Sequence, residues 1–133
     1  MFEVTPKNFL KRTKMRKIIG IPADGPELSD QVSLHFGHCN YFVGVEITED
    51  NHIRKAFSQQ NQGHSGCMEP VLAMKDKEVS DMIIGGIGGR PFMGFVQVGI
   101  NLYRAIEETI QQNVELFLEG KLEGLGGPSC QGH

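Results

Sequence analysis

Two short segments hold most of the histidine and cysteine side chains of this 133-residue chain. They are His35-Phe36-Gly37-His38-Cys39 and His64-Ser65-Gly66-Cys67. Imidazole nitrogen and thiolate sulfur are the ligands by which proteins hold zinc, copper, iron and iron–sulfur clusters. The two segments therefore predict a metal site with the ligands His35, His38, Cys39, His64 and Cys67. For each residue, the alternative of a buried, unreactive cysteine or a solvated loop histidine stays open.

Spacing adds to this prediction. His64 and Cys67 lie three positions apart, close enough to chelate one ion or to bind adjacent metals. Another such pair, Cys130 and His133, lies in the glycine-rich segment 123–133. When extended, the flexible tail that we expect here can span up to ~36–40 Å, enough to cross a small domain, so it can double back and add two ligands. A tail with an incidental cysteine is the alternative.

A run of glycines offers a different kind of contact. Gly85, Gly86, Gly88 and Gly89 precede Arg90 and an expected helix. Backbone N–H groups in such a loop, and the positive end of the helix dipole, favour an anion. No Gly-Lys-Ser or Gly-Lys-Thr follows, so the run is not a nucleotide-binding P-loop. We interpret it as a cofactor-binding loop that approaches an anionic sulfide cluster, with a tight strand-to-helix turn as the alternative.

Composition and charge exclude several classes of protein. The chain is 39% hydrophobic and 22% charged, with a mass of 14.7 kDa, which is typical of one globular domain and not of a disordered or fibrous chain. Residues 1–17 carry six basic and one acidic residue, and the remainder carries seven basic and fifteen acidic residues. A body this acidic disfavours nucleic-acid binding. No apolar run approaches the ~20 residues of a membrane span, and the basic start lacks the apolar core of a signal peptide. We therefore expect a cytoplasmic protein.

Catalytic patterns are missing from the sequence. No serine lies in a Gly-x-Ser-x-Gly context, and Cys39 with His35 lacks an obvious orienting partner for nucleophilic catalysis. The carboxylates of Asp24, Glu27 and Asp30 share one loop and are read as solvated. A protein without catalytic turnover is expected.

The elements that must position these residues alternate between strands and helices. Apolar and β-branched runs predict strands at 18–21, 41–48, 53–58, 81–84 and 100–103, the second and third forming an antiparallel hairpin. Helices are expected after residue 66, after Pro91 and after a capping box at Thr109 and Gln112. Apolar stripes at Phe92, Phe95 and Val96, and at Ile110, Val114, Phe117 and Leu118, predict the buried faces of the last two helices. The methionines at 68, 74, 82 and 93 are expected in the core.

This order predicts an α/β fold, a mixed sheet with helices on its faces and one antiparallel strand. Strands one, three and four would then end at the same edge, where ligands of open α/β sheets bind. The loops 23–40, 59–66 and 85–89 leave the strands at that edge. We expect His35, His38, Cys39, His64, Cys67 and the glycine loop to converge there.

Three stretches of the sequence resemble one known family. HFGHCNYFVGVEI at 35–47, MIIGGIGGRPFMGFVQVGINLY at 82–103 and TIQQNVELFLEGKL at 109–122 are similar to the dinitrogenase iron-molybdenum cofactor-binding family. The resemblance implies a three-layer α/β/α, ribonuclease H-like fold with a five-stranded mixed sheet. It places the family's motif histidine at His35 and its glycine loop at 85–89. Three segments are expected: a basic extension 1–14, a cofactor-binding domain 15–122 and the tail 123–133.

The function implied by the resemblance is the non-catalytic binding or carriage of an iron–sulfur or iron–molybdenum-type cluster during cofactor assembly or transfer, as a nitrogenase accessory protein. The partners would be proteins that donate or accept the cluster, and a homodimer is a further expectation. A zinc-binding regulatory or interaction protein, using the same ligands in tetrahedral geometry, is the alternative.

Overall fold

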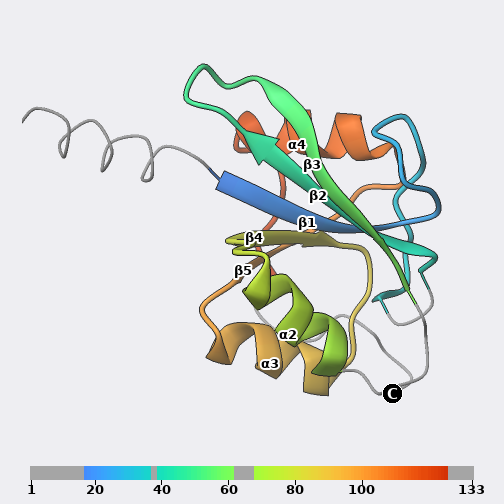
Figure 1. Cartoon of the computed structure of the whole chain (residues 1–133), viewed down its shortest axis with the longest axis vertical. Helices are drawn as coiled ribbons and strands as arrows, with labels where there is room; N and C mark the ends of the chain where they lie inside the picture. Colours follow the sequence, from blue (N-terminus) through green and yellow to red (C-terminus); the bar gives the residue numbers. More distant parts are fainter. Residues whose placement is uncertain (1–16, 37–38, 62–67, 126–133) are drawn as a thin grey trace, which may run out of the picture.

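A computed structural model describes residues 17–36, 39–61 and 68–125 of the chain. Five strands and three helices follow one another as β1 (Lys17–Ala23), β2 (Tyr41–Ile47), β3 (Ile53–Gln60), α2 (Met68–Asp76), β4 (Asp81–Ile84), α3 (Gly89–Gln97), β5 (Asn101–Arg104) and α4 (Ile110–Leu118). Figure 1 shows these elements. The order of strands and helices is the one that the sequence predicts. None of the helices that the structure describes is long and apolar enough to span a membrane.

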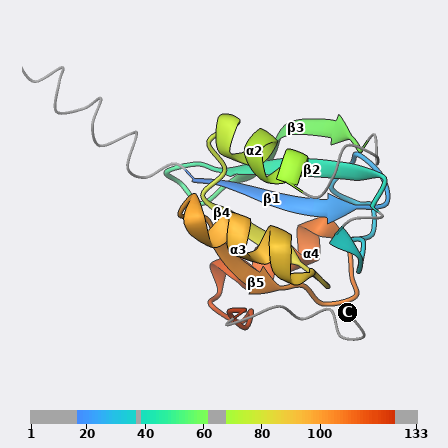
Figure 2. The ribbon, with the colours of Figure 1, turned by 90° about the horizontal axis from the view of Figure 1, so that it is seen from below.

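The five strands form one mixed sheet in the order β3-β2-β1-β4-β5. β2 pairs antiparallel with both β1 and β3, whereas β1 with β4 and β4 with β5 pair parallel. Four strands therefore run in one direction and β2 alone runs in the other. The sequence-based expectation of a mixed sheet with one antiparallel strand is confirmed, and Figure 2 shows β1 and β3 pointing toward the same side.

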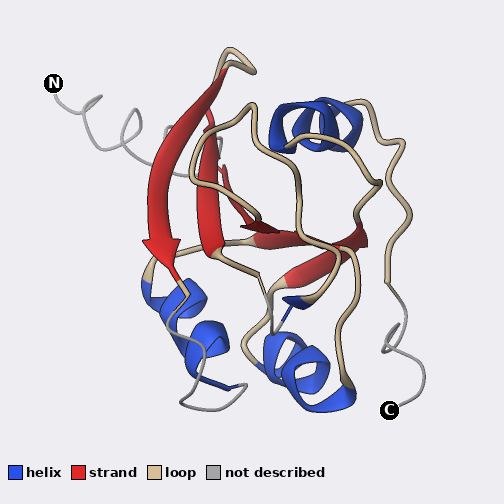
Figure 3. Ribbon diagram, turned by 90° about the vertical axis from the view of Figure 1, so that its right-hand side faces the viewer, coloured by secondary structure: helices blue, strands red, loops and turns tan. Residues whose placement is uncertain are grey.

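Helices cover both faces of the sheet, which gives three layers. α2 and α3 lie on one face and α4 lies on the other (Figures 1 and 3). One core cluster, with Met74, Met82 and Phe95 at its centre, fills the space beneath α2 and α3. The other, with Ile19, Val43 and Ile110, lies beneath α4. The three-layer α/β/α architecture agrees with the family resemblance, and the ribonuclease H-like label stays an expectation.

The helix ends follow the local signals. Thr109 caps α4 through a capping box, in which its side chain accepts a hydrogen bond from the Gln112 backbone and the Gln112 side chain accepts one from the Thr109 backbone. Gly99 and Gly120 have φ values of +81° and +72° just after α3 and α4, where a side chain would strain the backbone. These predicted helix boundaries are confirmed.

Three apolar residues that the sequence predicts in the core are exposed. Val96 and Met93 of α3 are each 50% exposed, and Leu118 at the end of α4 is 38% exposed. β5 is the last strand of the sheet, so the outer flank of α3 has no further strand to pack against. Leu118 lines an open hollow with Lys17 and Asn51, where the last turn of α4 meets the sheet end. Met74 and Met82 are buried as expected, and the side chain of Met68 lies outside the description.

The two edge strands of the sheet, β5 and β3, differ in what pairs with their outer sides. Outside β5, Gly124 forms an antiparallel bridge with Tyr103. The backbone of Arg104 donates to the Glu123 carbonyl at 2.8 Å, and that of Leu125 donates to the Leu102 carbonyl at 2.9 Å. β3 forms the opposite edge, with five of its eight residues exposed. The boundaries of the expected extension, domain and tail stay predictions.

Candidate metal-cluster site

The carboxyl ends of β1, β3 and β4 lie at one edge of the sheet, which follows from their shared direction. We call the described residues 33–36, 39–40, 61 and 85–90 at this edge the rim. The rim contains the predicted ligands His35 and Cys39 and the predicted glycine loop. His38, His64, Cys67, Cys130 and His133 lie outside the described residues. Convergence is therefore seen for residues 34–36 with Gly85 and Gly86, and it stays a prediction for the other loop residues.

His35 is presented on a braced backbone. The Ser33 hydroxyl accepts a hydrogen bond from the His35 N–H at 3.3 Å and donates one to the His35 carbonyl at 3.2 Å. The next residue, Phe36, is buried and packs its ring against Phe42 and Phe95, with centroids 5.4 and 5.5 Å apart. The His35 residue itself is exposed. A fixed backbone with an exposed imidazole suits a ligand that must bind and release a metal.

The His35 loop lies directly against the glycine loop. The backbone N–H of Phe36 donates to the Gly86 carbonyl at 3.0 Å. A Cβ added to Gly85 would lie 2.7 Å from the Leu34 Cα, and one added to Gly86 would lie 2.9 Å from the Leu34 oxygen. Neither glycine has a positive φ. Close approach of a neighbouring backbone, rather than a tight turn, explains why these two positions have no side chain.

The helix that follows the glycine loop begins without a side-chain cap. Its N-cap is Gly88, where an added Cβ would meet no atom within 4 Å, and the next residue, Gly89, is exposed. Arg90 in the first turn of α3 is also exposed. The start of α4 differs, because the N–H groups of Ile110 and Gln111 donate to the Asp30 and Leu28 carbonyls at 2.9 and 3.0 Å. Of these two helix starts, that of α3 suits an anion better.

Cys39 is a buried member of the rim, and its side chain lies in the core. It is 4% exposed and belongs to the same apolar cluster as Phe36, Phe42 and Met74. Burial raises the pKa of the Cys39 thiol from 9.0 to about 11, although hydrogen bonds from backbone and from Asn61 oppose the shift. The group is therefore a neutral thiol at pH 7. Metal ligation at Cys39 requires the loss of this proton and some opening of the loop.

The described part of the rim offers few donor groups for a metal. The described residues contain no group of three or more His, Cys, Asp or Glu side chains placed to hold a metal ion. They do provide an exposed imidazole, a thiol, an uncapped helix start and a guanidinium around one edge. Imidazole and thiolate can ligate a metal or a cluster, and a helix start and a guanidinium favour an anion.

Two polar residues of the rim escape sequence reasoning. They are Ser33, which braces His35, and Asn61, whose Nδ2 donates to the Cys39 carbonyl at 2.8 Å. Both lie in segments that read as polar loop or strand end, and neither belongs to a ligand motif. Only their places in the sequence could have indicated a role, because Ser33 lies near the predicted ligand His35 and Asn61 lies just after a predicted strand.

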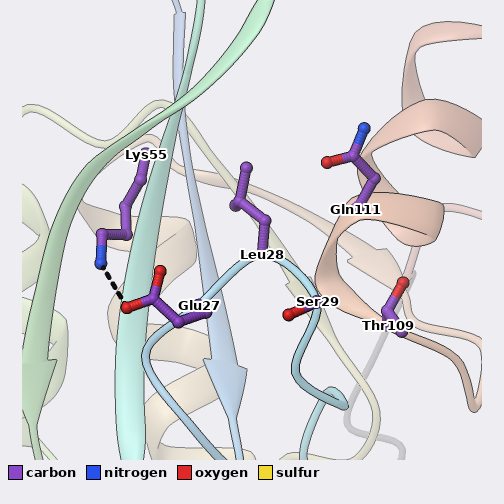
Figure 4. Close-up of a pocket in the computed structure, with 6 residues that line it drawn as sticks. All are labelled: Glu27, Leu28, Ser29, Lys55, Thr109 and Gln111. Atoms are coloured by element: carbon purple, nitrogen blue, oxygen red, sulfur yellow. Dashed lines mark hydrogen bonds and ion pairs between the residues drawn. The ribbon is translucent and has the colours of Figure 1, made fainter.

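A hollow of about 630 Å³ lies apart from the rim, between the loop after β1, β3 and the start of α4 (Figure 4). Lys55 reaches from β3 to this loop and donates to the Pro26 carbonyl and the Glu27 carboxylate, both at 3.3 Å. Thr109 and Gln111 line the opposite side. Neither of the described predicted ligands, His35 and Cys39, borders this hollow, and the ion pair between Lys55 and Glu27 ties the loop to the sheet.

Comparisons with known proteins identify the family of this chain. Residues 15–120 match the family described as dinitrogenase iron-molybdenum cofactor. An uncharacterized protein of Methanocaldococcus jannaschii is 33% identical over 119 residues, which cover 84% of this chain and 97% of that protein. Both matches extend over most of the chain and include the rim.

Two solved structures share the fold. The apo form of the orange protein from Desulfovibrio gigas aligns with a TM-score of 0.72 at 23% identity, over 84% of this chain and 95% of that chain. A candidate NifB protein from Thermotoga aligns with a TM-score of 0.72 at 26% identity, over 87% and 99% of the respective chains. With the family match over residues 15–120, the chain belongs to the dinitrogenase iron-molybdenum cofactor family.

Proposed function

We propose that this protein binds an iron–sulfur or iron–molybdenum-type cluster at the rim and carries it during cofactor assembly or transfer, without catalytic turnover. The observation that carries the proposal is the contact between the two predicted binding loops, where the Phe36 N–H donates to the Gly86 carbonyl at 3.0 Å. This contact brings the exposed His35 next to the glycine loop at the edge where parallel strands end. Membership of the family supports the same function.

In this proposal the cluster is cargo, and each part of the rim has a role. His35 supplies an imidazole ligand from the surface. The backbone N–H groups around Gly88 and Gly89, together with Arg90, neutralise the negative charge of the sulfides. Cys39 and Cys67 supply thiolates, and His38 and His64 supply further imidazoles. Cys130 and His133 act as a clamp that retains the cluster.

The exposure of the rim supports transfer rather than permanent storage. His35 and Arg90 are both exposed, so a partner protein that donates or accepts the cluster can reach the same edge. Transfer of a cluster from one protein to another requires that the site is accessible in both proteins. The partners in this proposal are therefore the cluster donors and acceptors of cofactor assembly.

Anaerobic reconstitution tests the proposal. The purified chain is incubated with iron, sulfide and molybdate, and uptake is read as metal and sulfide per chain and as visible absorption. His35→Ala and Cys67→Ser should each lower uptake, and the double change of Cys39→Ala and Cys67→Ser should abolish it. His52→Ala is the matched control, because His52 is exposed and precedes β3 at the sheet edge opposite the rim. Equal uptake by the parent and the double variant would exclude the thiolates as ligands.

Visible absorption in the same experiment also distinguishes a cluster carrier from a zinc-binding protein. A zinc protein is colourless, whereas a sulfide cluster absorbs visible light. A chain that binds one zinc ion tightly and takes up no cluster would replace the carrier function with a zinc-binding regulatory one.

A further inference from the structure

Two exposed apolar side chains lie close to the start of the glycine loop. Leu34 and Ile106 are each 38% exposed. Leu34 packs on the loop so closely that a Cβ added to Gly85 would lie 2.7 Å from the Leu34 Cα. Ile106 comes from the end of β5, where the Ala105 N–H donates to the carbonyl of Ile84, the residue before Gly85, at 3.0 Å. Both side chains therefore project near the same point, and we call the pair the apolar centre.

The backbone beneath the apolar centre is held in place. The fully buried Asn113 side chain accepts a hydrogen bond from the Ile106 N–H at 2.9 Å and donates one to the Ile106 carbonyl at 3.1 Å. Two residues after Leu34, the Phe36 N–H donates to the Gly86 carbonyl at 3.0 Å. A backbone that is already fixed loses little further conformational entropy on binding, which favours such residues as contact points for another protein.

Charges of opposite sign flank the apolar centre. Glu107 and Glu108 directly follow it, are exposed, and lead into the start of α4. Arg90 is exposed in the first turn of α3. Since α3 and α4 cover opposite faces of the sheet (Figure 3), the acidic pair and the arginine lie on opposite sides of the centre. Arg104, at the end of β5, is already paired with Glu123 at 3.2 Å. The surface therefore changes from acidic through apolar to basic across the sheet edge.

A surface with this order of charges is complementary to itself. When a second copy is rotated by 180° about an axis through the apolar centre, its acidic end meets the basic end of the first copy, and the two apolar centres meet each other. Each copy contributes two exposed apolar side chains to this contact. A contact of this size is typical of weak, reversible association rather than of a permanent dimer.

We infer that a second copy of this chain docks on the rim in a two-fold arrangement, with the apolar centres in contact and Arg90 of each copy facing Glu107 and Glu108 of the other. The inference goes beyond the proposed function, because association of the metal-free chain requires no cluster. In this arrangement the exposed His35 of both copies lies at the interface. A partner protein that takes up the cluster then has to displace the second copy from the rim.

Sedimentation of the full, metal-free chain over a range of concentrations, with chelator and reductant present, measures this association. The parent should pass from monomer to dimer as its concentration rises. Leu34→Glu and Ile106→Glu should each weaken dimerisation by at least about tenfold, because each change acts twice in a two-fold contact. Leu118→Glu is the matched control, since Leu118 is also 38% exposed but lies at the end of α4, away from the rim. A parent that stays monomeric up to millimolar concentration, or equal weakening by the control, would overturn the inference.

Charge reversal tests the two-fold geometry itself. One variant carries Glu107→Lys with Glu108→Lys, and the other carries Arg90→Glu. Each alone should dimerise more weakly than the parent, because like charges then face each other. An equimolar mixture should recover dimers of about the parent's strength, because the two reversed sets face opposite charges again. This recovery also shows that both variants are folded.

A second mixture excludes general attraction between chains of different net charge. When both charge variants also carry Ile106→Glu, their mixture should not recover dimers. Recovery in this second mixture, or none in the first, would overturn the arrangement. Failure of the proposed function is read separately, by reconstitution. A parent that takes up cluster but stays monomeric overturns only the inference, whereas a parent that dimerises but takes up no cluster overturns only the proposed function.

Discussion

At the scale of single residues, the neutral thiol of Cys39 links stability to pH in the metal-free chain. Its folded pKa of about 11 lies above the ordinary value of 9.0, so the folded state binds the proton more tightly than the unfolded state. The resulting stabilisation is fully present below pH 9 and is lost as pH rises toward 11. Two pKa units correspond to roughly 2–3 kcal/mol.

We therefore expect the free energy of unfolding of the parent to fall more steeply between pH 9 and 11 than that of Cys39→Ala. Urea unfolding of both chains across this range measures the difference, with other titrating groups common to both. Parallel curves of the free energy of unfolding against pH would show that folding does not raise the pKa of the Cys39 thiol.

Gly85 and Gly88 belong to one loop, but alanine at Gly85 is expected to destabilise the protein much more than alanine at Gly88. Gly85→Ala places a Cβ 2.7 Å from the Leu34 Cα, and backbone cannot give way as a flexible side chain can. We expect a loss of about 1–3 kcal/mol in the free energy of unfolding, together with weaker cluster uptake, because the His35 loop is pushed away from the glycine loop. Denaturant unfolding and reconstitution measure the two effects.

Gly88→Ala is the control for this change. Its Cβ meets nothing within 4 Å and its φ of −77° suits any residue, so the expected cost is below about 1 kcal/mol. A loss in Gly88→Ala as large as in Gly85→Ala would argue against crowding by Leu34 as the cause.

At the scale of elements, the starts of β1, β4 and β5 meet around one buried carboxylate, at the edge opposite the rim. Asp81 is fully buried and accepts hydrogen bonds from Ser80 at 2.5 Å and Asn101 at 3.4 Å, with the Lys17 Nζ 3.6 Å away. Asp81→Asn removes the charge that these donors share and places an amide N–H group against them. We expect a loss of about 2 kcal/mol in the free energy of unfolding.

Glu123→Gln is the comparison for Asp81→Asn. Glu123 pairs with Arg104 at 3.2 Å but is 78% exposed, so its loss should cost less than about 1 kcal/mol. Thermal unfolding of both variants measures the contrast. Equal effects would mean that burial of Asp81 adds nothing to its contribution.

The elements themselves could be predicted far better than the burial of particular side chains. The strand Asp81–Ile84 and the capping box of α4 were found from local patterns, because both depend on neighbours in sequence. The exposure of Val96 depends on where the sheet ends. The raised pKa of Cys39 depends on burial within the folded core, and its hydrogen bond with Asn61 joins residues 22 positions apart. No local sequence pattern contains either.

At the scale of the whole molecule, the two core clusters lie on opposite faces of the sheet, and Cys39 is the one predicted metal ligand that they contain among the described residues. A chain that buries this much apolar surface does not need a metal to fold. We expect the chelator-treated protein to keep the circular dichroism spectrum of an α/β protein and to unfold cooperatively. A random-coil spectrum after chelation would show that folding depends on the metal.

The unequal edges of the sheet limit how copies of this chain could assemble through their backbones. Residues 123–125 pair with the outer side of β5, whereas β3 forms the other edge of the sheet. Endless strand-to-strand stacking requires two open edges on every molecule, because each copy must both accept and offer a strand. Pairing through β3 would join two molecules and then stop. The geometry thus permits a closed pair and disfavours fibrous aggregation of the folded protein.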